Sequence, residues 1–278
     1  MPFQGRSRSE ASRKARPTRG SGPMAGRLDG RVAIITGGGH GIGRAYAHGM
    51  AREGAKVLVA EIDAQAGDVV AAELKTLGHD ALAVRTDVAD EASCRAMAQR
   101  AVDAWGKIDI LVSNAAIFAT IPMSRAPFDR IPIEEWDRMM TVNLRGTWLA
   151  SRACIEHMKQ RGYGKIITIS SGTAIKGSAG RIHYVTSKAG IIGFTRVLAR
   201  EVGEHGICVN CIAPGSTLSE ENPGEDVIRM RSAAKEDRAL KRLQTPEDIV
   251  GTAIFFAAPE SDFITGQTLV VDGGSAMH

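Results

Sequence analysis

The sequence has few cysteines, and their placement suits neither a disulfide framework nor a zinc site. The four are Cys94, Cys154, Cys208 and Cys211. Only the last two form a C-x-x-C spacing, which can indicate zinc or redox chemistry. They lie, however, in an apolar run (207–213) that predicts a strand, where side chains three apart point to opposite faces. Because no second Cys pair or His pair stands at ligand spacing, we expect buried free thiols in a reducing cytoplasm and chemistry that requires no metal.

Long apolar runs and a basic domain surface are missing too. No stretch reaches the roughly 18 apolar residues of a membrane-crossing helix, so we expect no membrane partner. The formal net charge is +4, but residues 1–24 hold six Lys or Arg and one Glu. That segment therefore carries +5 and the rest of the chain about −1. Such a domain offers no electrostatic reason to bind nucleic acid.

Residues 1–24 also have almost no large apolar side chains, which predicts a basic, disordered N-terminal extension. The segment lacks the apolar stretch of a secretory signal. Its Arg- and Ser-rich composition is like that of a mitochondrial transit peptide, but it lacks an apolar helix face. We expect an upstream start codon, with Met24 as the natural beginning. Residues 25–278 then have a suitable length for one α/β domain.

A glycine-rich turn, TGGGHGIG over 36–43, is the most informative stretch that is present. The β-branched run at 31–36 predicts a buried strand before it. Apolar residues recur at helical spacing from Ile42 to Met50 and predict an amphipathic helix after it. A strand that feeds a helix through such a turn leaves helix N–H groups unpaired beside backbone without Cβ atoms. That arrangement suits a diphosphate.

Glycines also close tight turns for structural reasons, so the dinucleotide interpretation needs an acidic residue about 20 positions further on. The predicted strand at 56–61 ends in Glu61, which favours dinucleotide binding. A carboxylate there accepts hydrogen bonds from ribose hydroxyls and repels a 2′-phosphate. Ile62 follows it rather than an arginine, and Arg44 is interpreted as a solvated side chain. We therefore expect NAD rather than NADP.

Strands and helices alternate along the remainder of the chain, without an internal repeat. The expected strands are 56–61, 81–86, 108–113, 165–170, 207–213 and 268–271, and the expected helices are 64–77, 91–105, 134–159 and 184–202. A further helix near 246 has Thr245 as its expected N-cap, with Pro246 and Asp248 after it. Alternation of this kind predicts a single-domain, doubly wound α/β fold with a parallel sheet covered on both faces.

The interval 216–243 breaks this alternation, because it is long, mixed in charge and poor in strand signals. In a parallel sheet it would lie beyond the carboxyl end of a strand, where ligands bind. Two interpretations are open: a mobile lid over a ligand, or a surface excursion.

Polar residues follow several strands at that same edge: Asp87, Asn114 and Ser171, with the pair Pro214-Gly215 after another strand. Tyr184 and Lys188 are four apart in a predicted helix and share one face. Each of these features has a structural explanation of its own. Their conjunction with the glycine turn favours a catalytic site.

Together these motifs resemble the short-chain dehydrogenase/reductase family, from about Leu28 to the C-terminus. The family's TGxxxGIG motif is met at 36–43, its NNAG motif by Ser-Asn-Ala-Ala at 113–116, and its motif asparagine by Asn143. Its serine and YxxxK match Ser171, Tyr184 and Lys188. Its PGxVxT motif matches Pro214 and Gly215, with Thr217 and Ser219 replacing Val and Thr. The resemblance implies a Rossmann-type sheet of about seven strands in the order 3-2-1-4-5-6-7.

The resemblance also implies a division of roles. Tyr184 removes the hydroxyl proton while hydride passes to the nicotinamide, and Ser171 holds the same oxygen by a hydrogen bond. Lys188 lowers the Tyr184 pKa and bonds the nicotinamide ribose. Asn143 holds a water that passes the proton outward. The expected cofactor contacts are Gly37, Gly39, His40, Gly41, Ile42, Gly43, Glu61, Asp87, Val88, Asn114, Ala115, Tyr184, Lys188, Pro214, Gly215, Thr217 and Ser219.

The predicted function is hydride transfer between NAD(H) and a small or medium secondary alcohol or ketone, in a cytoplasmic homotetramer. Ile117, Phe118, Thr173, Ile175 and the 216–243 segment are expected to line a mainly apolar pocket in which neither charge sign dominates. Two alternatives are open. One is an NADPH-dependent 3-oxoacyl thioester reductase of the same family. The other is a non-catalytic dinucleotide-sensing scaffold, which has no need of four catalytic residues.

Overall fold

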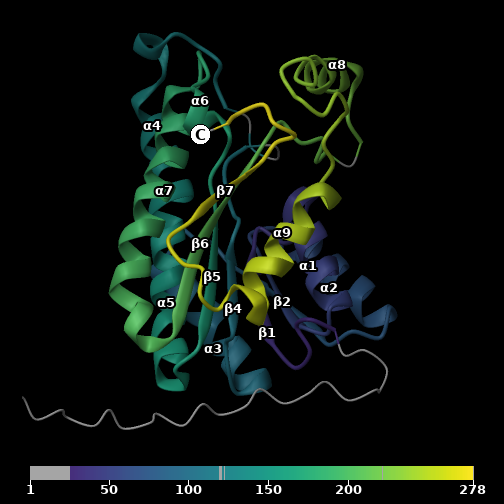
Figure 1. Cartoon of the computed structure of the whole chain (residues 1–278), viewed down its shortest axis with the longest axis vertical. Helices are drawn as coiled ribbons and strands as arrows, with labels where there is room; N and C mark the ends of the chain where they lie inside the picture. The colour runs from purple at the N-terminus through teal and green to yellow at the C-terminus, as the bar shows by residue number, and fades with distance from the viewer. Residues whose placement is uncertain (1–25, 119–120, 122, 221, 278) are drawn as a thin grey trace, which may run out of the picture.

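The computed structural model describes residues 26–118, 121, 123–220 and 222–277, shown in Figure 1. The predicted extension at 1–24 lies outside the described residues. Seven strands of the described chain form one parallel sheet in the order β3-β2-β1-β4-β5-β6-β7, which confirms the predicted topology. The strands are β1 (Val32–Thr36), β2 (Lys56–Glu61), β3 (Ala81–Arg85), β4 (Ile110–Ser113), β5 (Gly164–Ile169), β6 (Ile207–Pro214) and β7 (Thr268–Val271).

Helices cover both faces of the sheet, as Figure 1 shows. One apolar cluster packs α1 (Gly41–Arg52), α2 (Ala64–Thr76) and α9 (Glu247–Ala257) against one face. A second packs α3 (Glu91–Trp105), α5 (Gly146–Arg161) and α7 (Ile182–Val202) against the other. Successive strand residues feed opposite clusters, since Ala33 joins the first cluster and Ile34 the second. Burial on both faces explains why the strands are continuous apolar runs.

The strand register aligns the ends of neighbouring strands at one edge of the sheet. Thr36 pairs with Ala60 of β2 and with Ser113 of β4. Thr168 of β5 pairs with Ser113 and with Cys211 of β6. The residues that follow β1, β2, β4, β5 and β6 therefore emerge side by side, which is what positions the site.

The irregular elements differ from expectation in three places. The helix expected over 134–159 is three segments: α4 (Ile133–Met139), a π-helical turn (Met140–Arg145) and α5. The 216–243 interval contains α8 (Glu225–Ala233) and a short bridge that pairs Thr217 with Gln244. Helix α9 begins one residue later than predicted, with its first-turn Asp248 accepting a hydrogen bond from the Thr245 N–H at 3.0 Å. The remaining short elements are α6 (Thr173–Lys176) and the 3₁₀ turns Phe128–Arg130, Gly203–His205 and Pro259–Ser261.

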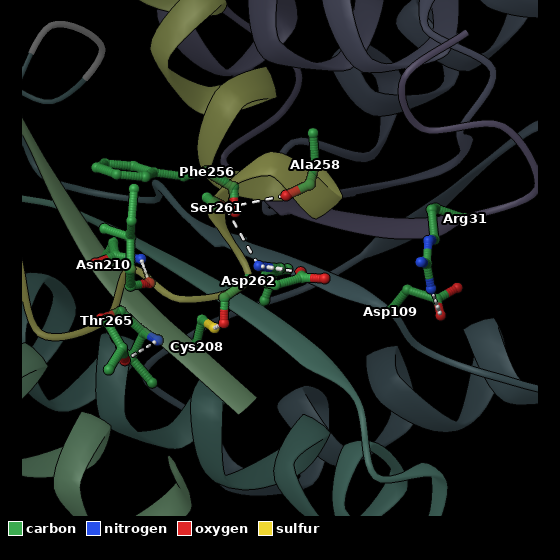
Figure 2. A network of polar contacts seen from close by, with 12 residues as sticks. Arg31, Asp109, Cys208, Asn210, Phe256, Ala258, Ser261, Asp262 and Thr265 are labelled. Atoms are coloured by element: carbon green, nitrogen blue, oxygen red, sulfur yellow. Dashed lines mark hydrogen bonds and ion pairs between the residues drawn. The ribbon is translucent and has the colours of Figure 1, made fainter. Parts of the chain in front are cut away.

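The amino edge of the sheet is closed by polar contacts, part of which Figure 2 shows. The fully buried Asp109 carboxylate pairs with Arg31 at 3.3 Å and with Lys107 at 2.8 Å, and it accepts from the Val32 N–H at 2.9 Å. Nearby, the Ser261 hydroxyl donates to the backbone carbonyls of Phe256 and Ala258. The Asp109 carboxylate and the Ser261 hydroxyl, both buried at this edge, are therefore hydrogen-bonded.

All four cysteines are buried and free, as predicted. Cys208 and Cys211 both lie on β6. Among the described residues, no three His, Cys, Asp or Glu side chains gather as metal ligands would. None of the described helices has the length and apolar character needed to cross a membrane.

Candidate active site

A cavity of about 1020 Å³ opens at the carboxyl edge of the sheet. Its walls come from the residues that follow β1, β2, β4, β5 and β6, together with α7 and the 216–243 segment. This volume lies at the upper end of the range for ligand pockets. The cavity has two halves. The glycine turn and Glu61 form one, while Phe118, Ser171 and Tyr184 belong to the other, which we call the substrate half.

The glycine turn is packed so closely that side chains would not fit. Gly37 and Gly41 have φ values of +64° and +49°, in the region that favours glycine. A Cβ on Gly43 would lie 1.9 Å from the Gly37 carbonyl oxygen. Helix α1 starts at this turn, and its N-cap His40 makes no capping bond through its side chain. The first N–H groups of α1 therefore face the cavity without a side-chain acceptor, which suits the diphosphate of a dinucleotide.

Glu61 ends β2 at the same half and is only 7% exposed. Its carboxylate accepts from the N–H of Gly39 at 3.0 Å and from the N–H of Ile62 at 2.9 Å. Gly39, predicted as a cofactor contact, lines a shallow neighbouring hollow instead of this cavity. Arg44, which we interpreted as solvated, is ion-paired with Glu73 at 2.8 Å.

Asn114 joins the end of β4 to the glycine turn. Its side-chain amide donates to the carbonyls of Thr36 at 3.1 Å and Gly37 at 3.0 Å, and its backbone N–H donates to the Thr36 hydroxyl at 3.0 Å. These bonds hold two strand ends together under the cavity. The other predicted cofactor contacts that line it are His40, Ile42, Asp87, Val88, Ala115, Pro214, Gly215, Thr217 and Ser219.

Ser171, Tyr184 and Lys188 meet in the cavity although they come from different elements. Tyr184 and Lys188 lie one turn apart on α7 and are 6% and 3% exposed. The Lys188 ammonium lies 6.0 Å from the centre of the Tyr184 ring and donates to the Ile169 carbonyl at 2.8 Å. Ser171 follows β5, and its hydroxyl lies 2.9 Å from that of Thr173. The arrangement places a phenol, a hydroxyl and an ammonium around one space.

Burial raises the Tyr184 pKa, while a hydrogen bond from Ser171 and the charges of Arg181 and Arg231 lower it. The sequence had assigned this lowering to Lys188. In the structure, burial lowers the Lys188 pKa itself to about 8. Two arginines that the motif does not include, Arg181 and Arg231, therefore add to the groups that favour the tyrosinate, and the expected contributions of Lys188 and of a bound nicotinamide stay predictions.

Asn143 does not line the cavity. It is fully buried in the π-helical turn, where its side-chain oxygen accepts from the Ile117 N–H at 2.8 Å. Its amide nitrogen donates to the Ser187 hydroxyl at 3.1 Å. Asn143 thus ties the loop after β4 to the residue beside Lys188. π-Helical turns inside α-helices are frequent at functional sites.

The substrate half is more polar than the sequence predicted. Phe118 and Thr173 line it, but Ile117 and Ile175 do not, because each packs into a buried apolar cluster. Sequence reasoning missed Arg181, which lines the cavity three residues before Tyr184. The i, i+3 spacing to the tyrosine was the signal that could have found it. Arg125 and Lys176 were also missed, and no sequence pattern pointed to them.

Comparison with known proteins agrees with this geometry. The family model described as "Enoyl-(Acyl carrier protein) reductase" matches residues 37–276. The short-chain reductase protein NovJ of Streptomyces niveus is 40% identical over 253 residues, covering 87% of this chain and 93% of that protein. Sorbitol dehydrogenase of Cereibacter sphaeroides is 39% identical over 262 residues, and the match covers 90% of this chain and 99% of that protein.

Among solved structures, the 3-ketoacyl-(acyl-carrier-protein) reductase of Brucella melitensis, in complex with NADH, superposes with a TM-score of 0.82. It is 31% identical, and the match covers 90% of this chain and all of that one. The relatives are oxidoreductases, and the cavity has the glycine turn, the buried acid and the strand-end asparagine that hold a nicotinamide dinucleotide. This chain belongs to the short-chain dehydrogenase/reductase family.

Proposed function

We propose that this chain is an NAD-dependent dehydrogenase that interconverts a small or medium secondary alcohol and its ketone. The observation that carries the proposal is the meeting of Ser171, Tyr184 and Lys188 in a cavity whose other half is the glycine turn with Glu61. A phenol, a hydroxyl donor and an adjacent dinucleotide cradle are together suited to proton and hydride transfer at a carbinol carbon.

When bound in the glycine-turn half, the cofactor accepts or supplies the hydride. The residues that would hold it are Gly37, Gly41, Glu61, Asn114 and Lys188. Tyr184, as tyrosinate, takes the proton of the carbinol hydroxyl, so that loss of a hydride and a proton leaves the ketone. Ser171 donates a hydrogen bond to the same oxygen and stabilises the charge that develops on it. In the reverse direction the Tyr184 phenol returns the proton.

Asn143 enters the proposal as a positioning residue. Its amide holds the Ile117 backbone and the Ser187 hydroxyl, and so fixes the part of α7 that carries Tyr184 and Lys188. The relay of the proton through a water, which the family resemblance implies, stays a prediction.

Preference for NAD over NADP is supported by Glu61. A 2′-phosphate on the adenosine ribose would meet a buried carboxylate there, and like charges repel. Arg44, the basic residue next to that end of the cavity, is engaged by Glu73. We therefore expect a lower KM for NADH than for NADPH.

A second candidate is reduction of 3-oxoacyl thioesters with NADPH. Two observations favour this substrate class: the likeness to the Brucella reductase, whose structure holds NADH and so does not favour NADPH, and the basic side chains that line the cavity. The scaffold alternative has less support, because it gives no role to Ser171 or Tyr184.

The test is a substrate panel. Purified protein is incubated with NAD or NADP and secondary alcohols, and with NADH or NADPH and ketones or acyl thioesters, while absorbance of the reduced cofactor is followed. We expect alcohol oxidation with NAD. Turnover confined to acyl thioesters and NADPH would support the second candidate. Binding of NADH without turnover across the whole panel would support the scaffold.

Three further proposals concern the whole chain. We propose a cytoplasmic homotetramer, supported by four free thiols and by exposed apolar side chains such as Trp148 of α5 and Val197 of α7. Sedimentation equilibrium tests the assembly.

We also propose that 25–278 is one dehydrogenase domain. Finally, we propose that the 216–243 segment is its lid, since Ser216, Arg231 and Arg238 line the cavity.

A further inference from the structure

Basic side chains outnumber acidic ones among the residues that line the cavity. Besides Lys188, the basic residues are Arg125, Arg138, Lys176, Arg181, Arg231 and Arg238; besides Glu61 and Asp87 of the glycine-turn half, the acidic residues are Glu220, Asp237 and Asp272. Two of these acids are already engaged. Glu220 pairs with Arg231 at 2.6 Å, and Asp272 accepts from the backbone N–H groups of 274–276. The balance is an excess of positive charge next to the proposed reacting centre.

Among these cations, Arg181 is the best placed to bind an anionic group beside Tyr184. It immediately precedes α7, three residues before Tyr184, and is only partly exposed. Its Nε and Nη2 groups both donate to the Ser178 hydroxyl, at 3.2 and 2.5 Å, which fixes the guanidinium. No carboxylate of the described residues lies within ion-pair distance of it. Its charge nevertheless acts on Tyr184, whose pKa it lowers.

Two further cations, Arg125 and Arg231, lie near Arg181 and act on its charge. The Ala126 N–H donates to the Gly180 carbonyl at 3.1 Å, which brings the loop that carries Arg125 against the start of α7. Burial, followed by the charge of Arg125 and then that of Arg231, lowers the Arg181 pKa. Like charges at close range disfavour one another, and an anion among them would relieve that repulsion.

Arg231 supplies a second, independent observation. It is 5% exposed and lies over the Phe118 ring at 5.2 Å, and Phe118 in turn packs against the Tyr184 ring at 5.2 Å. Its Nη2 is used by Glu220, but its buried Nε has no hydrogen-bond partner within the described structure. A buried N–H donor without a partner is costly, so it marks a place where an acceptor is missing.

We propose that the substrate is a hydroxy acid or the corresponding keto acid, whose carboxylate accepts hydrogen bonds from the guanidinium of Arg181. The carbinol oxygen lies at Ser171 and Tyr184, and Arg231 adds positive potential from behind Phe118. The planar guanidinium can donate two parallel hydrogen bonds to a carboxylate. Because Arg181 is only three residues before Tyr184, we expect few carbon atoms between the carboxylate and the carbinol carbon. This inference rests on the proposed dehydrogenase function and names the substrate class of the same site.

The test compares each acid with its own neutral isostere. kcat/KM with NAD is measured for 2-, 3- and 4-hydroxy acids of short chain length and for the matching hydroxy amides. The wild-type enzyme should prefer at least one acid over its amide by roughly 10- to 100-fold, as expected for a charge-assisted hydrogen bond. In Arg181→Gln the acid-to-amide ratio should fall toward one. Arg181→Lys keeps the charge without the fork and should give an intermediate ratio.

Arg100→Gln is the matched control, because Arg100 is exposed on α3 and does not line the cavity. Its acid-to-amide ratio should equal that of the wild type. Wild-type ratios near one across the panel, with neutral alcohols oxidised, would overturn the carboxylate site and leave the dehydrogenase function standing.

A binding measurement separates the two proposals if no alcohol is oxidised. Butyrate and butyramide are titrated into the NADH-loaded protein by calorimetry, with wild type, Arg181→Gln and Arg100→Gln side by side. Tighter binding of butyrate that only Arg181→Gln abolishes supports the anion site even where the dehydrogenase proposal has failed. Equal binding of butyrate and butyramide to the wild type overturns it.

Discussion

Asp109 at the amino edge of the sheet and Lys188 at the carboxyl edge are both deeply buried charges, but they differ in their partners. At the amino edge, the Asp109 carboxylate is fully buried between two cations and a backbone N–H. At the carboxyl edge, Lys188 is almost as buried, yet its ammonium donates to a neutral carbonyl, that of Ile169, and pairs with no carboxylate of the described residues. A buried charge with partners stabilises a fold, whereas one without an ionic partner costs stability. The carboxyl edge therefore keeps an unpaired charge in reserve for a ligand.

A pair of tyrosines shows the same contrast. Burial raises the pKa of both Tyr163 and Tyr184, the former to about 12. Tyr163 lies under Arg31 at the amino edge, 4.0 Å from the guanidinium, and its hydroxyl has no hydrogen-bond partner within the described structure. Tyr184 lines the cavity together with Ser171, which lowers the Tyr184 pKa. Two buried phenols thus differ in whether a reacting group can approach them.

The largest expected effect separates these tyrosines. Tyr184→Phe should lower kcat/KM by about 10³-fold, because it removes the only proton acceptor of the proposed reaction. Tyr163→Phe should leave kcat/KM within about twofold, since its hydroxyl makes no bond that the site uses. Steady-state kinetics give both values, and NADH titration checks that the cofactor still binds. Equal losses in the two variants would contradict the distinction between the edges.

The second prediction concerns a residue of the amino edge, whose substitution should change stability and not activity. Asp109→Asn should lower the free energy of unfolding by about 3 kcal/mol, because Arg31 and Lys107 lose their shared anion. The value lies at the low end for a buried pair, since both cations are partly exposed. kcat/KM per folded molecule should not change. Urea unfolding followed by circular dichroism measures the first quantity, and a loss of activity without a loss of stability would contradict the prediction.

Much of the fold followed from the sequence, because buried parallel strands are short apolar runs and helices between them require right-handed crossovers. The predicted strands agree with β2 to β7 within two residues at each end. The π-helical turn at Met140–Arg145 did not follow. In this turn, Asn143 forms hydrogen bonds with the Ile117 N–H and the Ser187 hydroxyl. Because these two residues are far apart along the chain, no local sequence pattern predicts the turn.

Part of the candidate site could likewise be predicted from the sequence, and part could not. The glycine turn and the Ser171, Tyr184 and Lys188 set were predictable because their spacing reflects chemistry that only those residue types supply. Ile117 was assigned to the pocket wrongly, since an apolar side chain suits a pocket wall and a core equally. The approach of Arg125 to Arg181 depends on how one loop packs against Gly180, which is a tertiary contact.

A third prediction tests whether the lone charge at the carboxyl edge is costly. An unfolded lysine keeps its proton up to about pH 10.4, whereas folded Lys188 loses it near pH 8. Between these values the unfolded state binds more protons, so the contribution of Lys188 to stability rises with pH. Below pH 8 its full penalty, on the order of 3 kcal/mol, is present.

Lys188→Met should therefore be more stable than the cofactor-free wild type below pH 8, and the gap should close as the pH approaches 10. Urea unfolding of both proteins from pH 6 to pH 10 gives the difference, in which the titrations of buried groups that do not interact with Lys188 cancel. The Cys211 thiol does interact with Lys188, so the comparison is made in a Cys211→Ala background. A difference that does not vary with pH would mean that Lys188 is not desolvated in the folded protein.

The smallest expected effect concerns the carboxylate at the carboxyl edge. Glu61 accepts from three backbone N–H groups, whereas Asp109 accepts from one, and Glu61 borders the cavity. Glu61→Gln keeps the shape and removes the charge that would repel a 2′-phosphate, so the NAD-to-NADP ratio of kcat/KM should fall by about tenfold. Asp109→Asn is the matched control, with the same loss of charge at the opposite edge and no expected change in the ratio. If both variants left the ratio unaltered, cofactor choice would have to depend on groups other than this buried acid, and Glu61 would have no role in selecting the cofactor.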